Sequence, residues 1–216
     1  MSNFGKSIIK KLSQDYELIS ASYHEAGHVV YGLLNFIKIQ AVAVNSSPKN
    51  TEDLGYTHYE LINNDFGDPD LANLLQLSEI NINYAGLVAE KIYYKDICGS
   101  DKFPMMLKSG CSQDIETAAA LIKKFNLSPP GKKRYLFKKK LLRESKVLFE
   151  EHWDAVKLIA HALYDKKKLH YSDLKDILTK KSKNKIFWKN RFKEINLLFD
   201  AAELLDEKVA RSILIK

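Results

Sequence analysis

Two histidines and a glutamate near the N-terminus have the residue types and the spacing of a reactive metal site. They stand in the run His24-Glu25-Ala26-Gly27-His28. On an α-helix, residues four apart project from one face, so His24 and His28 can bind a single Zn²⁺ through imidazole nitrogens. Glu25 then lies where it can take a proton from metal-activated water, whose pKa is roughly 7. The competing interpretation is a chance pattern on an amphipathic helix, with a histidine packed against the core.

The residues around this motif predict the helix that the chemistry requires. Apolar side chains recur at helical spacing from about residue 14 to residue 36. Residues 37–61 favour short strands, and no other part of the sequence does. From Asp70 onward the pattern is mainly helical apart from a loop at residues 95–110, with Gly86 interrupting one helix for close packing and Ser112 capping another over residues 113–125. We therefore expect a mainly α-helical fold with a small β-sheet or hairpin near the active site.

Composition and charge narrow the class of protein. The 216 residues are 45% hydrophobic and 28% charged, which is typical of a folded globular chain. No apolar stretch reaches the roughly 18 residues of a membrane span, and the start of the chain lacks the apolar segment of a signal peptide. We therefore expect a cytoplasmic protein without membrane insertion, in which the two cysteines are free thiols.

Several segments, in order, resemble the peptidase domain of the FtsH family of AAA zinc metalloproteases. The first is the signature helix around the histidine pair, residues 21–28. The others are a Leu-Gly-Tyr-Thr strand at 54–57, an Ala-Gly-x-x-Ala-Glu helix at 84–90, an aspartate-bearing segment at 109–118 and a helical end at 148–178. The resemblance covers approximately residues 11–178.

The resemblance implies a complete ligand set for Zn²⁺. It adds Asp114 to His24 and His28 as the third metal ligand. An aspartate in the first turn of a helix feels the positive end of the helix dipole, which favours the ionised form that a metal requires. The alternative is that Asp114 only caps its helix, in which case Glu116 is the nearby substitute.

Two further groups of residues acquire expected roles. Gly55, Tyr56 and Thr57 would form a strand edge to which a peptide substrate adds by backbone hydrogen bonds, although ordinary hairpin packing explains them as well. Glu90 would accept a hydrogen bond from a ligand histidine, and a plain surface glutamate is the alternative.

The sequence divides into an FtsH-like zinc peptidase domain, residues 1–179, and a basic amphipathic helical extension, residues 180–216. It contains no phosphate-binding loop of the Gly-x-x-x-x-Gly-Lys-Ser/Thr type, so we expect an ATP-independent zinc endopeptidase acting on unfolded or extended polypeptides. A separate ATPase or adaptor and a homo-oligomer are the partners to consider.

Two other functions stay open. The first is a catalytically silent zinc-binding module with a regulatory or interaction role. The second, which we favour least, is a nucleic-acid-associated protein, because the net charge of +7 is concentrated in lysine clusters such as residues 132–146 and 180–193. A solvated helix face explains these clusters more simply.

Overall fold

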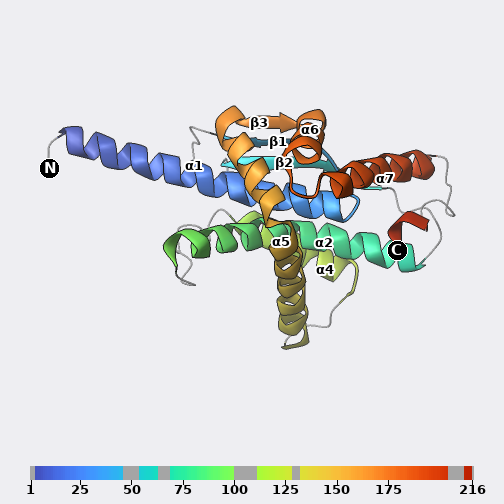
Figure 1. Cartoon of the computed structure of the whole chain (residues 1–216). Helices are drawn as coiled ribbons and strands as arrows, with labels where there is room; N and C mark the ends of the chain where they lie inside the picture. The colour runs from blue at the N-terminus through green and yellow to red at the C-terminus, as the bar shows by residue number, and fades with distance from the viewer. Residues whose placement is uncertain are drawn as a thin grey trace.

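The computed structural model of the chain describes residues 3–45, 54–62, 69–99, 111–127, 132–203 and 212–215. It is mainly α-helical with one small antiparallel sheet, so the predicted fold class is confirmed (Figure 1). Within these residues, no helix is both long enough and apolar enough to cross a membrane.

Among the described residues, the main elements follow the order helix, two strands, three helices, one strand and two helices. Their bounds are α1 (Asn3–Leu34), β1 (Lys38–Val44), β2 (Gly55–Glu60), α2 (Pro69–Cys98), α4 (Ser112–Lys124), α5 (Lys132–Lys166), β3 (Lys168–His170), α6 (Tyr171–Lys181) and α7 (Lys185–Glu203). Helix α2 runs unbroken through Gly86, so the predicted interruption is wrong. Helix α4 begins at Ser112 and its N-cap is Cys111, not Ser112 as predicted.

The sheet has the strand order β2-β1-β3, and both pairings are antiparallel. Strands β1 and β2 lie inside the predicted region, but β3 was not predicted from the sequence. It has three residues, of which only Leu169 is buried, so it offers no alternating pattern to detect. Its conformation comes from pairing with β1 between Ala41 and Ala43.

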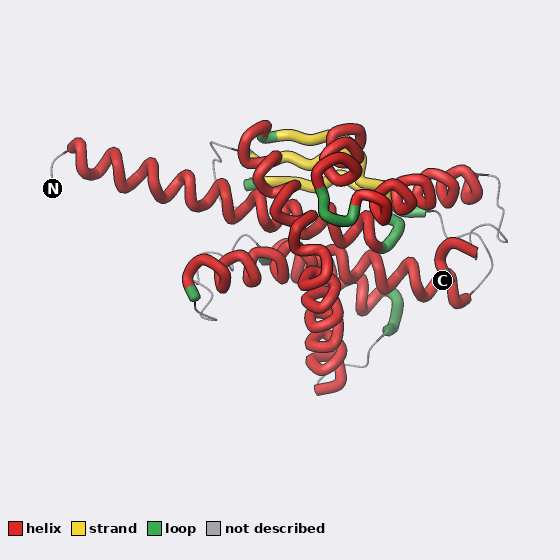
Figure 2. The backbone as a smooth tube through the Cα atoms, in the orientation of Figure 1, coloured by secondary structure: helices red, strands yellow, loops and turns green. Residues whose placement is uncertain are grey.

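The C-terminal half of helix α1 lies between the sheet and helix α2, whereas its N-terminal half projects from the body of the molecule (Figure 1). The helix contacts β1 and β2 on one side and packs against α2 and α5 on others (Figures 1 and 2). Every residue from Ser20 to Leu34 is buried, which includes the whole histidine motif. A helix enclosed on all sides holds its polar side chains in fixed positions, because each must find a partner inside the protein.

The C-terminal helix α7 packs onto the same core. Trp188 is fully buried, and Phe192 and Ile195 follow it at helical spacing in the same hydrophobic cluster as α1. The aromatic residues of this region therefore dock onto the body of the chain. The boundary at residue 180 stays a prediction, and residues 204–211 and 216 of the extension lie outside the described part of the chain.

Candidate metal centre

Three donor atoms from two helices converge on one point. His24 Nε2 lies 2.9 Å from Asp114 Oδ2, His28 Nε2 lies 3.3 Å from the same oxygen, and the two Nε2 atoms are 3.0 Å apart. Ligands about 2.0–2.1 Å from a tetrahedral Zn²⁺ are about 3.3 Å from each other. The two nitrogens and the carboxylate oxygen thus have the chemistry and nearly the spacing of a zinc ligand set. Glu116, the substitute considered above, is exposed.

Gly86 on α2 keeps the space beside these atoms open. A Cβ at this position would lie 2.5 Å from His24 Nε2 and 2.6 Å from His28 Nε2, closer than any ordinary contact. The volume that a side chain would fill is therefore the volume next to the two candidate ligand nitrogens. We predicted a packing role for this glycine. Its close approach to both ligand nitrogens could be recognised only from the structure.

The close crossing of α1 and α2 depends on a second glycine. A Cβ on Gly27 would lie 2.6 Å from Ala89 Cβ and 2.7 Å from the Ala85 carbonyl oxygen. The small residues between the two histidines and in the facing turn of α2 let the helix backbones approach. This approach brings Gly86 and Glu90 of α2 to the histidine face of α1.

The second nitrogen of each histidine has an acceptor that fixes the ring. His28 Nδ1 donates to the Ile82 carbonyl oxygen at 2.7 Å, which leaves Nε2 with a lone pair turned to the site. His24 Nδ1 lies 3.4 Å from Glu90 Oε2. Metal-binding histidines usually make such outer hydrogen bonds. Glu90, 4% exposed, is thus placed where the sequence analysis put it.

Glu90 is held by two residues that the sequence analysis did not assign to the site. Ser20 Oγ donates to Glu90 Oε1 at 2.6 Å, and the Cys111 thiol donates to Glu90 Oε2 at 3.4 Å. The Cys111 sulfur also lies 3.6 Å from His24 Nδ1. Burial raises the pKa of the Cys111 thiol, which keeps it a donor. In the sequence, the one signal of this role was a cysteine three residues before Asp114.

His24 and Asp114 shift each other's protonation in the metal-free protein. Burial lowers the pKa of His24, but hydrogen bonds to Asp114, Cys111 and Glu90 outweigh it and raise the pKa well above its usual range. Burial raises the pKa of Asp114, yet hydrogen bonds to His24 and His28 and their charges hold it well below its usual range. Asp114 is therefore ionised, as a metal ligand would have to be, and a metal ion bound here would have to displace the proton of His24.

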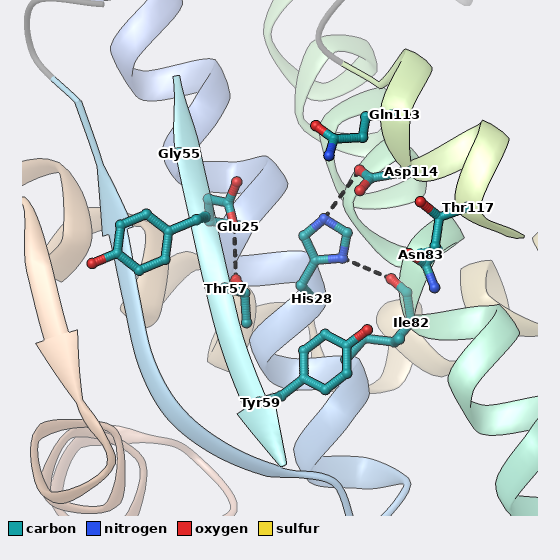
Figure 3. A pocket seen from close by; sticks show the side chains of 11 residues that line it. Glu25, His28, Gly55, Thr57, Tyr59, Ile82, Asn83, Gln113, Asp114 and Thr117 are labelled. Carbon is teal, nitrogen blue, oxygen red and sulfur yellow. Dashed lines mark hydrogen bonds and ion pairs between the residues drawn. The ribbon is translucent and has the colours of Figure 1, made fainter. Parts of the chain in front are cut away.

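The carboxylate of Glu25 lies against strand β2. Thr57 Oγ1 donates to Glu25 Oε2 at 2.7 Å. A Cβ on Gly55 would lie 2.8 Å from both Cγ and Oε1 of Glu25, so a larger residue there would displace the carboxylate. Figure 3 shows β2, with Gly55 and Thr57, passing in front of Glu25, and His28 of the same helix beside the strand. The strand thus orients the carboxylate beside the candidate metal position.

The edge of β2 that faces away from β1 pairs with no other strand among the described residues. Asn45 N–H donates to the Leu54 carbonyl at 2.9 Å. Because hydrogen-bonded pairs alternate in an antiparallel ladder, Tyr56 directs its backbone groups toward β1, and Gly55 and Thr57 direct theirs to the open edge. Tyr56 instead offers its side chain, which is 53% exposed.

A pocket lies between strand β2 and two of the three donor residues, His28 and Asp114. Its lining comes from α1, β2, α2 and α4. The residues are Glu25, His28, Gly55, Tyr56, Thr57, Tyr59, Ile82, Asn83, Gln113, Asp114 and Thr117 (Figure 3). The pocket therefore opens onto Glu25, two of the three candidate ligands and all three predicted substrate-binding residues. Glu90 lies behind the histidines, away from the pocket lining.

Comparison with known proteins brings no family assignment: no protein-family model matches the chain, and no curated protein matches it significantly.

Proposed function

We propose that this chain is a zinc-dependent, ATP-independent endopeptidase of unfolded or extended polypeptides, similar to the peptidase domain of the FtsH family. The observation that carries the proposal is the convergence of His24 Nε2, His28 Nε2 and Asp114 Oδ2 within 3.3 Å beside Glu25 and an open strand edge. This donor set fits Zn²⁺, because two neutral imidazoles and one carboxylate leave a fourth position for water or substrate.

Bound Zn²⁺ would lower the pKa of a water molecule and polarise the scissile carbonyl. Glu25 accepts the proton of the attacking water and then delivers it to the leaving amine. Thr57 holds the Glu25 carboxylate in position through its 2.7 Å hydrogen bond. Ser20 and Cys111 hold Glu90, which in turn orients the His24 ring. Each protonation step is thereby assigned to a side chain that has a fixed partner.

The substrate would bind as an extended strand along the open edge of β2. The backbone groups of Gly55 and Thr57 supply the hydrogen bonds of such an added strand, which requires no particular substrate sequence. Only an unfolded or locally extended segment can present a free backbone in this way. This is the reason for proposing unfolded polypeptides as the substrate class.

Metal analysis combined with casein hydrolysis tests the proposal. We expect purified wild type to contain one zinc and to cleave casein without ATP. Glu25→Gln should retain zinc and lose activity by about 10²- to 10⁴-fold, the usual contribution of a general base. Asp114→Ala should lose both zinc and activity.

The other outcomes discriminate between the functions left open. Zinc without cleavage would contradict the endopeptidase and favour the silent zinc-binding module. Wild-type protein that binds no zinc would overturn the site itself. A cytoplasmic location, a separate ATPase or adaptor and a homo-oligomer belong to this proposal and need localisation and co-purification experiments.

A further inference from the structure

Tyr59 lies on the face of β2 that covers helix α1. It pairs with Ile39 of β1, and directly paired residues of an antiparallel ladder point their side chains to the same face. Ile39 is fully buried, and a Cβ added to Gly32 of α1 would lie 2.8 Å from its Cδ1 atom, so Ile39 faces α1. The Tyr59 side chain therefore faces α1 as well, near the turn that follows His28.

Strand β2 connects the general base to the far end of the pocket. Thr57 donates its 2.7 Å hydrogen bond to Glu25, and Tyr59 follows Thr57 on the same face of the strand, about 6.6 Å further on. Tyr59 lines the pocket together with His28 and Asp114, and Figure 3 shows its ring on the same side of β2 as these two residues. A carboxylate near the start of β2 and a phenol near its end thus border the same pocket.

The phenol hydroxyl of Tyr59 is available as a hydrogen-bond donor. It forms no hydrogen bond with any residue in the described part of the chain. Burial, then the charges of Glu79 and Asp114, raise the pKa of Tyr59 above its usual value. Since an ordinary tyrosine is already protonated at neutral pH, the hydroxyl keeps its proton there.

Other polar side chains of the lining are already engaged or point elsewhere. Thr57 Oγ1 donates to Glu25, and Asn83 Nδ2 donates to the Glu79 carbonyl oxygen at 2.7 Å. The side chain of Tyr56 alternates with that of Thr57 along the strand, so it lies on the other face of β2 and is 53% exposed. Within β2, the Tyr59 hydroxyl is therefore the donor that can meet a substrate without giving up another hydrogen bond.

We propose that Tyr59 is a catalytic residue, whose hydroxyl donates a hydrogen bond to the carbonyl oxygen of the scissile bond as that oxygen becomes negatively charged. This inference rests on the proposed peptidase function. The water oxygen bonds to the carbonyl carbon, one water proton passes to Glu25, and the π electron pair moves onto the carbonyl oxygen. When the carbonyl re-forms, the C–N bond breaks and the leaving nitrogen takes the proton from Glu25. Tyr59 keeps its own proton throughout, and its hydrogen bond is strongest while the oxygen is charged.

Tyr59→Phe tests this role, because it removes the hydroxyl and keeps the ring that packs against the core. For an extended peptide substrate, kcat should fall about 10²-fold, the usual effect of removing one donor to such an oxygen. KM and zinc content should change little, since the hydrogen bond forms mainly in the transition state. An unchanged kcat would contradict the proposal.

Tyr84→Phe is the matched control. It makes the same chemical change on α2, the helix that contributes Ile82 and Asn83 to the pocket, but Tyr84 itself is not part of the lining. The Tyr84 ring is 1% exposed and packs in a separate hydrophobic cluster with Ala118 of α4. The control should keep the wild-type kcat. Circular dichroism and metal analysis establish that both variants are folded and contain zinc.

A binding measurement separates this inference from the proposed function. Two fluorescent extended peptides share one sequence, and at the central bond one has the ordinary amide and the other a phosphinic group, a charged tetrahedral mimic of the transition state. Both are titrated by fluorescence anisotropy with zinc-loaded Glu25→Gln protein, with and without Tyr59→Phe. Loss of the hydroxyl should weaken binding of the phosphinic peptide about 10- to 100-fold, the effect of one hydrogen bond to a charged group. Binding of the amide peptide should not change.

The outcomes distinguish the role of Tyr59 from the peptidase itself. A loss confined to the phosphinic peptide supports the hydrogen bond from Tyr59 even if the wild type cleaves nothing, a result that would refute the peptidase alone. Cleavage with the same kcat in Tyr59→Phe overturns the role of Tyr59 and leaves the peptidase standing. An equal loss for both peptides also overturns it, because such a loss reflects packing or substrate binding. Wild-type protein that neither cleaves nor binds either peptide overturns both.

Discussion

Replacing Gly86 by alanine should disrupt the proposed zinc site while leaving the fold in place. The added Cβ would lie 2.5 Å and 2.6 Å from the Nε2 atoms of His24 and His28, and ordinary contacts begin at 3.4 Å. One of the groups must therefore move by about 0.9 Å, whereas a zinc site tolerates errors of about 0.2 Å in its ligand distances. We expect the affinity for zinc to fall by at least about 100-fold, or about 2.7 kcal/mol.

The substitution should change the free energy of unfolding less than it changes the free energy of zinc binding. Alanine in the middle of a helix is about 1 kcal/mol more favourable than glycine, which offsets part of the strain from the displaced histidines. The assay is competition for zinc with a chromogenic chelator, together with circular dichroism and thermal unfolding of the zinc-free protein.

Gly32→Ala is the control for this experiment. It makes the same change inside buried helix α1, where the new Cβ would meet the flexible end of Ile39 at 2.8 Å and lies away from the ligand atoms. It should disturb packing slightly and leave zinc affinity unchanged. If Gly86→Ala binds zinc as the wild type does, the placement of the metal beside Gly86 is wrong.

Three further predictions address the carboxylate, the metal-free pair and the C-terminal helix. Thr57→Val removes the 2.7 Å hydrogen bond to Glu25, so kcat for casein should fall about tenfold with zinc content unchanged; an unaltered kcat would show that Glu25 needs no such support. In chelator-treated protein, the raised pKa of His24 contributes stability that is fully present below the unfolded pKa of 6.5. This stability is lost as the pH rises through the folded pKa. The lowered pKa of Asp114 contributes stability that is fully present above the unfolded pKa of 3.8. This stability is lost as the pH falls through the folded pKa. The difference in Tm between wild type and Asp114→Asn should therefore be largest from roughly pH 4 to 6.5, and a flat difference from pH 3 to 10 would contradict the pair. Trp188→Ala should cost about 3–5 kcal/mol in urea unfolding, because Trp188 is fully buried, and a loss below about 1 kcal/mol would mean that α7 is not part of the core.

The spacing of His24 and His28 and the position of Glu25 beside them could be predicted from the sequence, because a helix places residues four apart on one face whatever surrounds it. The strands at residues 38–44 and 55–60 were predictable for the same reason, since their patterns are local. Asp114 was reached only through a family resemblance. Nothing in its local pattern distinguishes a ligand from a helix cap.

Only the tertiary structure decided which distant residues meet at the centre. The 2.9 Å approach of Asp114 to His24 joins residues 90 positions apart, and it depends on the packing of α2 against both α1 and α4. The same packing produces the close approach of Gly86 to both histidines and the hydrogen bond from Cys111 to Glu90. Strand β3 likewise exists because β1 lies beside it. Local periodicity in a sequence predicts one helix or strand at a time. A metal centre is defined by distances between several helices and strands. Those distances depend on how closely the small residues at each helix crossing let the backbones approach.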